Sequence, residues 1–484
     1  MTPKQSLTGS FLYRPSNDRN QVDITYRDFD VNNNLLQTQI REDRERETER
    51  MVEGDLHWEK NYEKKGHKWS ADLQFQDEKD HERSDINQYN LGENENLIQR
   101  VSNIEDEENF MLQTDYVRPL TEDRGFEVGS RLRFRNIRND YMVEEQNDQG
   151  NFIELPDFTN NFLYTENVYA GYGIYKDDIG EKITYQGGLR LEYTGIITEL
   201  LSEDEPNQRD YLNLFPSASM TYEFNPLSDL QVSYSRRIDR PNFWSLLPFF
   251  SFSDNRVFFS GNPDLNPEFA DSYELGYMRY WEKASLYSGL YYRHTMGKTE
   301  RITTVDSNGF TTIFPINLSV EDAYGFEFNY QHDLTNWWSI NANINLFHSV
   351  STGNYDGVNY AANTFSSSGR VNSQVEFWKS KLQASFNFRG PRQTAQGRNL
   401  GIYSMNLGWS KDLLNEKATI SLSVQDVFNS RKRRSYTNGP GFESYSEFQW
   451  RQRQINLSFT YRLNQNKSRK PASRGSSDMG DDDF

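Results

Sequence analysis

The chain has 484 residues, of which 35% are hydrophobic and 14% aromatic, and its formal net charge is −18. The high aromatic content indicates a folded chain, and the acidic balance excludes nucleic acid as the main partner because a phosphate backbone would be repelled. No stretch contains the 18 or more consecutive apolar residues of a membrane-spanning helix. This composition remains compatible with a β-barrel, whose strands face lipid only with every second residue.

Apolar and polar residues alternate along many segments, as they do in strands with one face in water. In chain order, the clearest segments are residues 131–135, 183–193, 382–389, 418–425 and 455–462. Stacking such polar faces against a second sheet would bury unpaired charges, so a wide hydrated interior is favoured. The lumen-facing candidates are Arg131, Arg133, Arg135, Arg190 and Arg389, and the apolar face of the terminal strand consists of Ile455, Leu457, Phe459 and Tyr461.

The alternation predicts about nineteen strands, with centres near residues 10, 25, 55, 73, 113, 131, 170, 188, 218, 233, 276, 290, 328, 342, 372, 386, 406, 421 and 456. Tight turns, such as residues 225–228 and 379–380, alternate along the chain with long connections, such as 239–271 and 297–322. Short periplasmic turns and long extracellular loops are typical of outer-membrane barrels. We therefore predict an all-β fold, a large antiparallel transmembrane β-barrel over residues 1–463, followed by a polar, disordered tail at residues 464–484.

Strand parity leads to an expectation about the start of the chain. Both ends of such a barrel lie in the periplasm, so the strand number should be even and the first strand should run outward. Counting back from an inward strand that ends near Arg462 makes the strand at residues 6–13 run inward as well. Either the count is wrong by one, or at least one strand precedes Met1; the absence of a visible signal peptide favours the second interpretation.

Residues 235–277 carry a composite motif. Ser-Arg-Arg-Ile-Asp-Arg-Pro at 235–241 precedes an aromatic-rich loop, which is followed by Gly-Asn-Pro-Asp-Leu-Asn-Pro-Glu at 261–268 and Ser-Tyr-Glu-Leu-Gly-Tyr at 272–277. This order resembles the barrel of TonB-dependent outer-membrane receptors, particularly the outer-membrane β-barrel family abundant in Bacteroidetes, and Asp-Val-Phe-Asn at 426–429 agrees with it. The motif residues are Arg240, Pro241, Gly261, Asn262, Pro263, Asp264, Leu265, Asn266, Pro267 and Glu268.

The resemblance implies a bacterial outer-membrane protein with about twenty-two strands and an N-terminal plug domain that engages the TonB complex. Neither the plug nor a TonB-binding segment is found in these residues, so the barrel is expected to be N-terminally incomplete. The implied partners are outer-membrane lipid, TonB through the missing plug, a surface lipoprotein and an unknown nutrient ligand. The implied function is TonB-dependent uptake of a nutrient such as a siderophore, a glycan or a peptide.

Two prolines in the motif cannot donate backbone hydrogen bonds, so this segment should form a stiff extracellular loop that leads into an inward strand. Its residues either shape the loop or contact ligand. The lumen arginines, together with Trp244, Phe249 and Phe250, either bind ligand or line the lumen and pair with the plug. The rival functions are a passive porin-like or secretion barrel without a plug, and a soluble all-β adhesion or binding protein.

Nothing in the sequence indicates catalysis. The chain has no cysteine, and its six histidines lack the short spacings of zinc sites. Neither a Gly-x-Ser-x-Gly turn nor a phosphate-binding Gly-x-x-x-x-Gly-Lys loop occurs. Carboxylates are plentiful, but no pair stands out as catalytic. We therefore expect no enzymatic activity, no resident metal and no cofactor.

Overall fold

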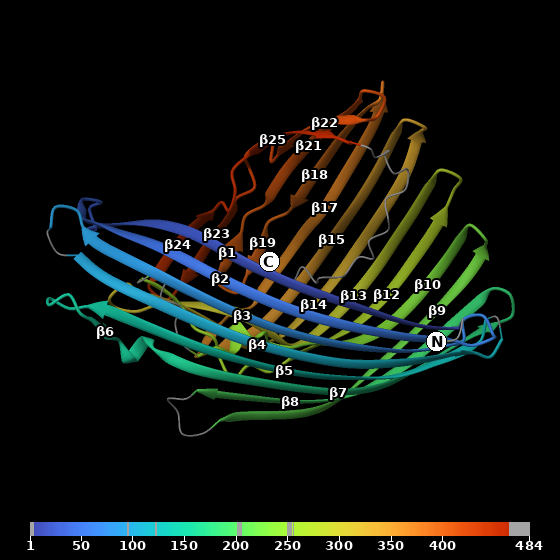
Figure 1. Ribbon diagram of the computed structural model, residues 1–484, viewed down its shortest axis with the longest axis horizontal. Helices are drawn as coiled ribbons and strands as arrows, with labels where there is room; N and C mark the ends of the chain where they lie inside the picture. Colours follow the sequence, from blue (N-terminus) through green and yellow to red (C-terminus); the bar gives the residue numbers. More distant parts are fainter. Residues whose placement is uncertain are drawn as a thin grey trace.

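A single sheet of 21 strands, curled around a hollow interior, dominates the computed structural model (Figure 1). The structure describes residues 4–93, 96–121, 123–200, 206–248, 254 and 256–463. Three of the 21 strands are segments of two or three residues, which leaves eighteen long strands in this part of the chain. Among the residues described, no helix has both the length and the apolar character needed to cross a membrane.

The elements follow one another in a simple order. The long strands are β1 (Gln5–Phe29), β2 (Leu35–Asn61), β3 (Lys68–Asn90), β4 (Asn96–Pro119), β5 (Gly125–Gln146), β7 (Asn160–Ile179), β8 (Ile183–Leu200), β9 (Asn207–Asn225), β10 (Ser228–Asp239), β12 (Glu268–Tyr280), β13 (Ala284–Val305), β14 (Thr311–Thr335), β15 (Trp338–Tyr355), β17 (Ala362–Phe377), β18 (Ser380–Arg389), β21 (Ile402–Leu413), β22 (Ala418–Gln425) and β25 (Gln454–Tyr461). The short strands of the same sheet are β6 (Phe152–Glu154), β11 (Val257–Phe259) and β16 (Val358–Asn359). A separate sheet contains β19 (Arg392–Thr394), β20 (Gly397–Asn399), β23 (Arg433–Gly439) and β24 (Phe442–Phe448), and the helices are η1 (Pro156–Phe158) and α1 (Phe243–Leu246).

Each long strand pairs antiparallel with the next long strand, from β1 with β2 to β22 with β25. The predicted fold class, an all-β chain with a large antiparallel sheet, is thus confirmed. Within the residues described, β2 is the only partner of β1 and β22 the only partner of β25. All eight residues of β25 are exposed, including Ile455, Leu457, Phe459 and Tyr461. The described sheet therefore has two open edges.

One predicted boundary is wrong. Residues 5–29 form the single strand β1 rather than two strands centred near 10 and 25, and β1 pairs with β2 through Pro15 and the Ser-Asn-Asp that follows it. A strand with a partner on one side accommodates proline because half of its backbone amides need no acceptor in the ladder. The number of long strands described is consequently even, which removes the odd count from which a preceding strand was inferred.

The two ends of the sheet, along the strand direction, carry connections of different lengths. At one end the turns are short, as at 226–227, 281–283 and 378–379, whereas the other end carries the longer segments 147–159, 240–267, 390–401 and 426–453. This asymmetry assigns the second end to the cell exterior. The predicted long loop at 297–322 is wrong: β13 continues to Val305 and β14 starts at Thr311.

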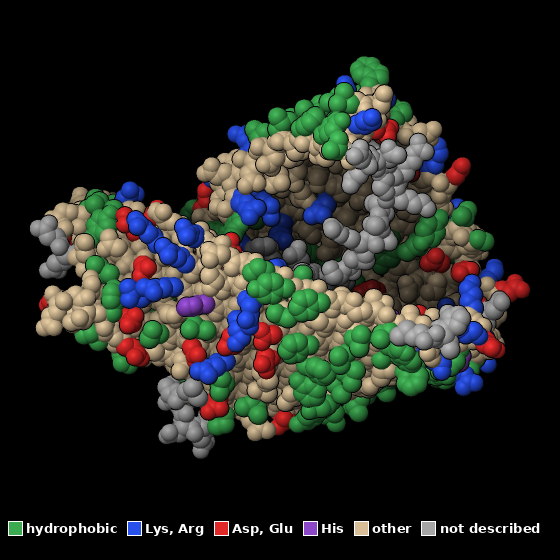
Figure 2. All heavy atoms as spheres, viewed as in Figure 1, with side chains coloured by type: hydrophobic (Ala, Val, Ile, Leu, Met, Phe, Trp, Pro, Cys, Tyr) green, Lys and Arg blue, Asp and Glu red, His purple; other side chains and the backbone are tan. Residues whose placement is uncertain are grey.

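Strands β1 to β5 have 22 to 27 residues each. Crossing a bilayer requires only about 9–11 tilted residues. These strands therefore continue past the outer leaflet as paired hairpins, and Figure 2 shows hydrophobic side chains over one part of their outer surface and charged side chains over the other.

The outer and inner faces alternate as predicted. On β8, Leu189, Leu191 and Tyr193 are 49, 47 and 41% exposed, whereas Glu192 between two of them is 4% exposed. On the outer face of neighbouring strands, an aromatic row runs from Tyr234 through Tyr273, Tyr292 and Tyr324 to His348, with ring centroids 5.0 to 6.3 Å apart. Such a row fits the aromatic belt at a membrane interface.

On the inner face, aromatic rings lie over glycines. Tyr291 of β13 donates a hydrogen bond to Asn345 Oδ1 at 3.1 Å, and its ring covers Gly325 on β14. A Cβ at Gly325 would overlap this ring, so Gly325→Ala is expected to displace Tyr291 and to lower the free energy of unfolding by about 1–3 kcal/mol. Denaturant unfolding in detergent, followed by the mobility of the folded band on gels, measures the loss. Gly171→Ala, whose Cβ meets nothing within 4 Å, is the control; equal stability of the two variants would contradict the packing role.

Candidate functional site

The inner wall of β4, β5, β7 and β8 carries paired charges. Arg135 donates to both carboxylate oxygens of Glu107, with Nε 2.8 Å from Oε1 and Nη2 2.7 Å from Oε2. Arg133 lies 4.0 Å from Glu166, and Arg190 Nε donates to Glu192 at 2.9 Å. These three arginines have carboxylate partners on the barrel itself, and pairing of lumen arginines with a plug stays a prediction. Arg131 shares the face of Arg133, and Arg389 is exposed on the face of Asn387.

The connection between β10 and β12 is the longest irregular segment that faces this wall. We call its described residues, 240–248, 254 and 256–267, the strap. In Figure 1 the strap is the yellow-green segment inside the curve of the sheet. Its contacts, described below, reach β1, β5, β7, β8, β9 and β14, so it crosses the extracellular mouth. The predicted loop position is correct, but the loop turns into the lumen.

Arg240 fixes the first end of the strap. Its guanidinium donates to Glu192, to Thr194 Oγ1 at 3.1 Å and to Tyr211 Oη at 3.2 Å, and it lies 3.9 Å from Glu166. Glu166 and Glu192 are 5 and 4% exposed. Burial lowers the pKa of Arg240, and the nearby Glu166 opposes this shift. Because arginine stays charged in proteins, Arg240 joins Arg133 and Arg190 in an ion-pair network around two buried carboxylates.

Apolar packing holds the middle of the strap. Phe243, Leu246, Leu247 and Leu265 are each at most 7% exposed. Phe243 lies 5.8 Å from the ring of Phe162 and 5.9 Å from that of Tyr164. The same cluster includes the inward-facing Ile86, Val101, Ile137, Tyr141, Val143 and Ile196. Helix α1 begins after Asn242, whose side chain accepts a hydrogen bond from Ser245 N. Burial of these side chains favours the inward position of the strap.

The Gly-Asn-Pro motif forms hydrogen bonds between the two limbs of the strap, the first limb being residues 240–248 and the second residues 256–267. Gly261 N donates to Leu247 O and Asn262 N donates to Ser245 O, each at 2.7 Å. Asn262 Nδ2 also donates to Pro315 O of β14 at 3.1 Å. The remaining motif contacts are Arg209 with Asp264 Oδ1 (3.0 Å) and with Leu265 O, Asn266 N with Asn317 Oδ1 (2.7 Å), Glu268 with Lys298 (3.1 Å), and Pro241, Pro263 and Pro267 beside Ile196 and Tyr211. These contacts shape the loop, and direct ligand contact stays a prediction.

Arg256 attaches the strap to the opposite wall. Its guanidinium donates to both oxygens of Asp28 at 2.5 and 2.9 Å and lies over the ring of Tyr26, 4.5 Å from its centroid. Tyr26 in turn donates to Asp254 at 2.6 Å. The hydrogen bond with Asp28 raises the pKa of Arg256. The strap is therefore anchored at β1 as well as at β8.

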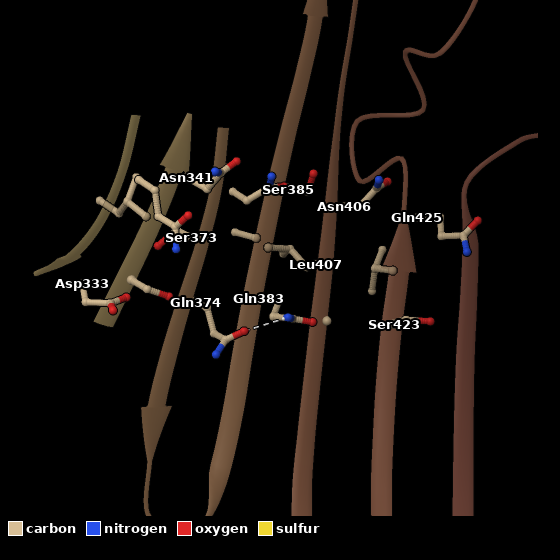
Figure 3. Close-up of a pocket in the computed structure, with 17 residues that line it drawn as sticks. Asp333, Asn341, Ser373, Gln374, Gln383, Ser385, Asn406, Leu407, Ser423 and Gln425 are labelled. Atoms are coloured by element: carbon tan, nitrogen blue, oxygen red, sulfur yellow. Dashed lines mark hydrogen bonds between the residues drawn. The ribbon is translucent and has the colours of Figure 1, made fainter. Parts of the chain in front are cut away.

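A second part of the inner wall is nearly uncharged. The inner faces of β14, β15, β17, β18, β21 and β22 border a cavity of about 580 Å³, in which Asp333 is the only charged lining residue described (Figure 3). Gln383 Nε2 donates to Gln374 Oε1 at 2.9 Å, and Figure 3 shows amides and hydroxyls from neighbouring strands on this surface. Such groups donate and accept hydrogen bonds without selecting for charge.

Other candidates from the sequence lie apart from these contacts. Trp244 is 56% exposed beside Phe243, and Phe249 and Phe250 lie outside the described residues. In the described part of the chain, no three His, Asp or Glu residues are grouped so that they could hold a metal ion. Sequence reasoning missed Arg256 and its partner Asp28, which are 228 positions apart; no local signal connects them.

A curled antiparallel sheet with an apolar outer face and a polar lumen defines an outer-membrane β-barrel. Residues 60–461 match the outer membrane protein beta-barrel family, and the chain belongs to that family. A comparison with curated proteins gives no match. The protein is therefore a β-barrel of the bacterial outer membrane.

Solved structures show the same fold at low sequence identity. The chain is similar to the copper transporter OprC, with a TM-score of 0.57 at 11% identity over 94% of this chain and 79% of OprC. It is similar to the ferric yersiniabactin uptake receptor FyuA from Yersinia pestis, with a TM-score of 0.52 at 12% identity over 95% of this chain and 80% of FyuA. The ferric-catecholate import receptor Fiu from E. coli K12 gives a TM-score of 0.53 at 12% identity, over 94% and 80% of the two chains.

Proposed function

We propose that this chain is the barrel of a TonB-dependent receptor, of the type abundant in Bacteroidetes, that imports a scarce nutrient and catalyses no reaction. The observation that supports it best is the size of the sheet. Eighteen long strands enclose a lumen that is too wide for their own side chains to fill, and the sheet has two open edges. Barrels of 16–18 strands leave an aqueous channel, and barrels of about 22 strands contain a plug. The similar import receptors have the same fold.

The open edges support a second element of the proposal. Unpaired backbone amides cost several kcal/mol each in the bilayer core. We propose that further strands pair with β1 and β25 to close the barrel, and that a plug domain occupies the lumen and contacts TonB. Residues 464–484, predicted to be a disordered tail, lie outside the described residues.

The strap fits a receptor better than an open pore. A molecule arriving from outside meets the strap, fixed at Arg240 and Arg256, before it reaches the amide-lined wall. The proposed nutrient is an iron chelate, a glycan, a peptide or a similar molecule, and it is delivered with or without a surface lipoprotein. A passive porin-like barrel is the alternative that an open lumen also allows.

Uptake assays in cells test the proposal. Deleting the gene should reduce import of its nutrient, found by comparing growth on iron chelates, cobalamin, glycans and peptides, to the background rate. Deleting TonB should have the same effect on import, because a plugged barrel needs energy to open. Import that persists without TonB would identify a passive barrel. Extraction of the protein without detergent would contradict the membrane location.

A further inference from the structure

Three arginines lie directly opposite one another on the outer face of the extended hairpins. Arg19 of β1 pairs with Arg46 of β2, and Arg46 pairs with Arg83 of β3. All three side chains are exposed, and Arg44 lies beside them on the same face of β2. Like charges directly opposite each other on a sheet are destabilising. The cluster therefore has a cost that nothing in the fold requires.

The neighbouring carboxylates neutralise only part of this arginine cluster, which we define as Arg19, Arg44, Arg46 and Arg83: Asp85 lies opposite Arg44 on the ladder and within ion-pair distance of Arg83. Asp77 binds Arg50 at 3.2 Å, Asp106 binds Lys79 at 3.2 Å, and Asp85 lies 3.1 Å from Arg100 but 3.7 Å from Arg83. Among the ion pairs and hydrogen bonds of the described residues, none involves the side chains of Arg19, Arg44 or Arg46. The exposed guanidinium groups of Arg19 and Arg46 are therefore available to an external anion.

The sheet itself separates the cluster from the acidic residues at the same height. Asp18, Glu45, Glu47 and Glu82 occupy alternate positions on the same strands, so their side chains point to the lumen. Their carboxylates cannot reach the guanidinium groups on the other face. At the level of this row, three paired arginines therefore occupy the outer face, whereas Asp18, Glu47 and Glu82 pair in the same way on the inner face.

The height of the cluster points to the kind of anion. The continuous apolar band on these strands ends at Val52 of β2, which pairs with Tyr13 of β1. Arg46 lies six positions beyond Val52 along β2. At about 3.3 Å per residue and a strand tilt of about 40°, it stands roughly 15 Å above the apolar band. A phospholipid headgroup layer is only about 5–8 Å thick.

We propose that the arginine cluster binds the phosphate groups of an outer-leaflet glycolipid, whose phosphorylated sugars extend above the phospholipid level. Guanidinium groups suit this role because their planar donors bind phosphate oxygens in pairs. Several positive charges next to an anionic surface also add affinity. The site faces lipid rather than the lumen, so it is independent of the proposed uptake function.

Lipid binding to the full chain, purified in an uncharged detergent, tests the site. The probe is rough-type lipopolysaccharide with a phosphorylated core, and the triple variant R19Q/R46Q/R83Q should bind it on the order of 10- to 100-fold more weakly than wild type. Enzymatic removal of the core phosphates should weaken wild-type binding similarly. Unchanged binding by the triple variant would overturn the proposal, and so would equal binding of phosphatidylglycerol micelles or of inorganic phosphate, which would assign the cluster to phospholipid or to free anions.

A matched control changes the same charge at the other edge of the apolar band. K60Q/R118Q/R279Q removes three positive charges from the outer face near the short turns and should bind the probe as wild type does. The heat-dependent shift of the folded band on gels verifies folding of each variant. Because the triad is mutually repulsive, the triple variant should be at least as stable as wild type without lipid. If it fails to fold, R46Q alone, at the centre of the triad, serves as the second variant and should still weaken binding.

Discussion

Replacement of Arg240 by glutamine should release the first end of the strap. The guanidinium lies between Glu166 and Glu192, which are almost fully buried and also have Arg133 and Arg190 as partners. Removing one member of a buried ion pair costs about 3–5 kcal/mol when a charge is left uncompensated, so this value is the upper bound of the expected loss. The chain has no natural cysteine, so a Leu246→Cys reporter, at a position that is 3% exposed, can measure the change. Its reaction with a maleimide should be slow with Arg240 and much faster with Arg240→Gln.

The second anchor of the strap provides the control. Arg256→Gln removes an ion pair with Asp28, whose side chain is 37% exposed, and exposed pairs contribute only about 0–1 kcal/mol. Reporter reactivity should therefore rise little. Equal reactivity in the Arg240→Gln and Arg256→Gln backgrounds would show that the buried pair does not hold the strap.

The membrane-spanning part of the fold was predictable because lipid and water impose a period of two. In β8, the apolar Leu189 and Leu191 alternate with the charged Arg190 and Glu192, and this alternation can be recognised from one strand alone. The boundary at Pro15 failed because proline and its polar neighbours also form turns, and local sequence does not reveal whether a strand has a partner on both sides.

The extended hairpins above the bilayer were harder to predict. Residues 43–47 alternate between acidic and basic side chains rather than between apolar and polar ones. Above the bilayer both faces of the sheet are in water, so hydrophobic periodicity disappears although the ladder continues. The sequence therefore predicts a loop at 297–322, whereas most of this segment continues β13 and β14.

The site was predictable in part. The motif around Pro263 and Pro267 identified an extracellular loop from local backbone chemistry alone. That this loop folds inward depends on Phe243 and Leu247 packing against strands that lie far away in sequence. The partners of Arg240 are likewise 29 to 74 positions earlier in the chain. Such contacts depend on the curvature of the whole sheet, which local patterns do not encode.

The second large effect on the strap is expected from a substitution of Gly261 in the motif. Gly261→Ala should separate the two limbs of the strap, because its Cβ would overlap Leu247 O and lie 2.5 Å from Leu247 N, both of them backbone atoms that cannot rotate away. The hydrogen bonds of Gly261 and Asn262 to the first limb would be lost. Overpacking of this kind costs about 1–3 kcal/mol. Hydrogen exchange measured by mass spectrometry should become faster in peptides 243–248 and 257–267 and remain unchanged in β22.

Gly187→Ala on β8 is the matched control, because its Cβ meets nothing within 4 Å; this variant should exchange like wild type. Nutrient import separates the two interpretations of the motif. If Gly261 shapes the strap, import and strap protection should change together, and both should stay normal in Gly187→Ala. If import falls while the strap exchanges at the wild-type rate, the motif contacts the ligand directly and its structural role is the wrong explanation.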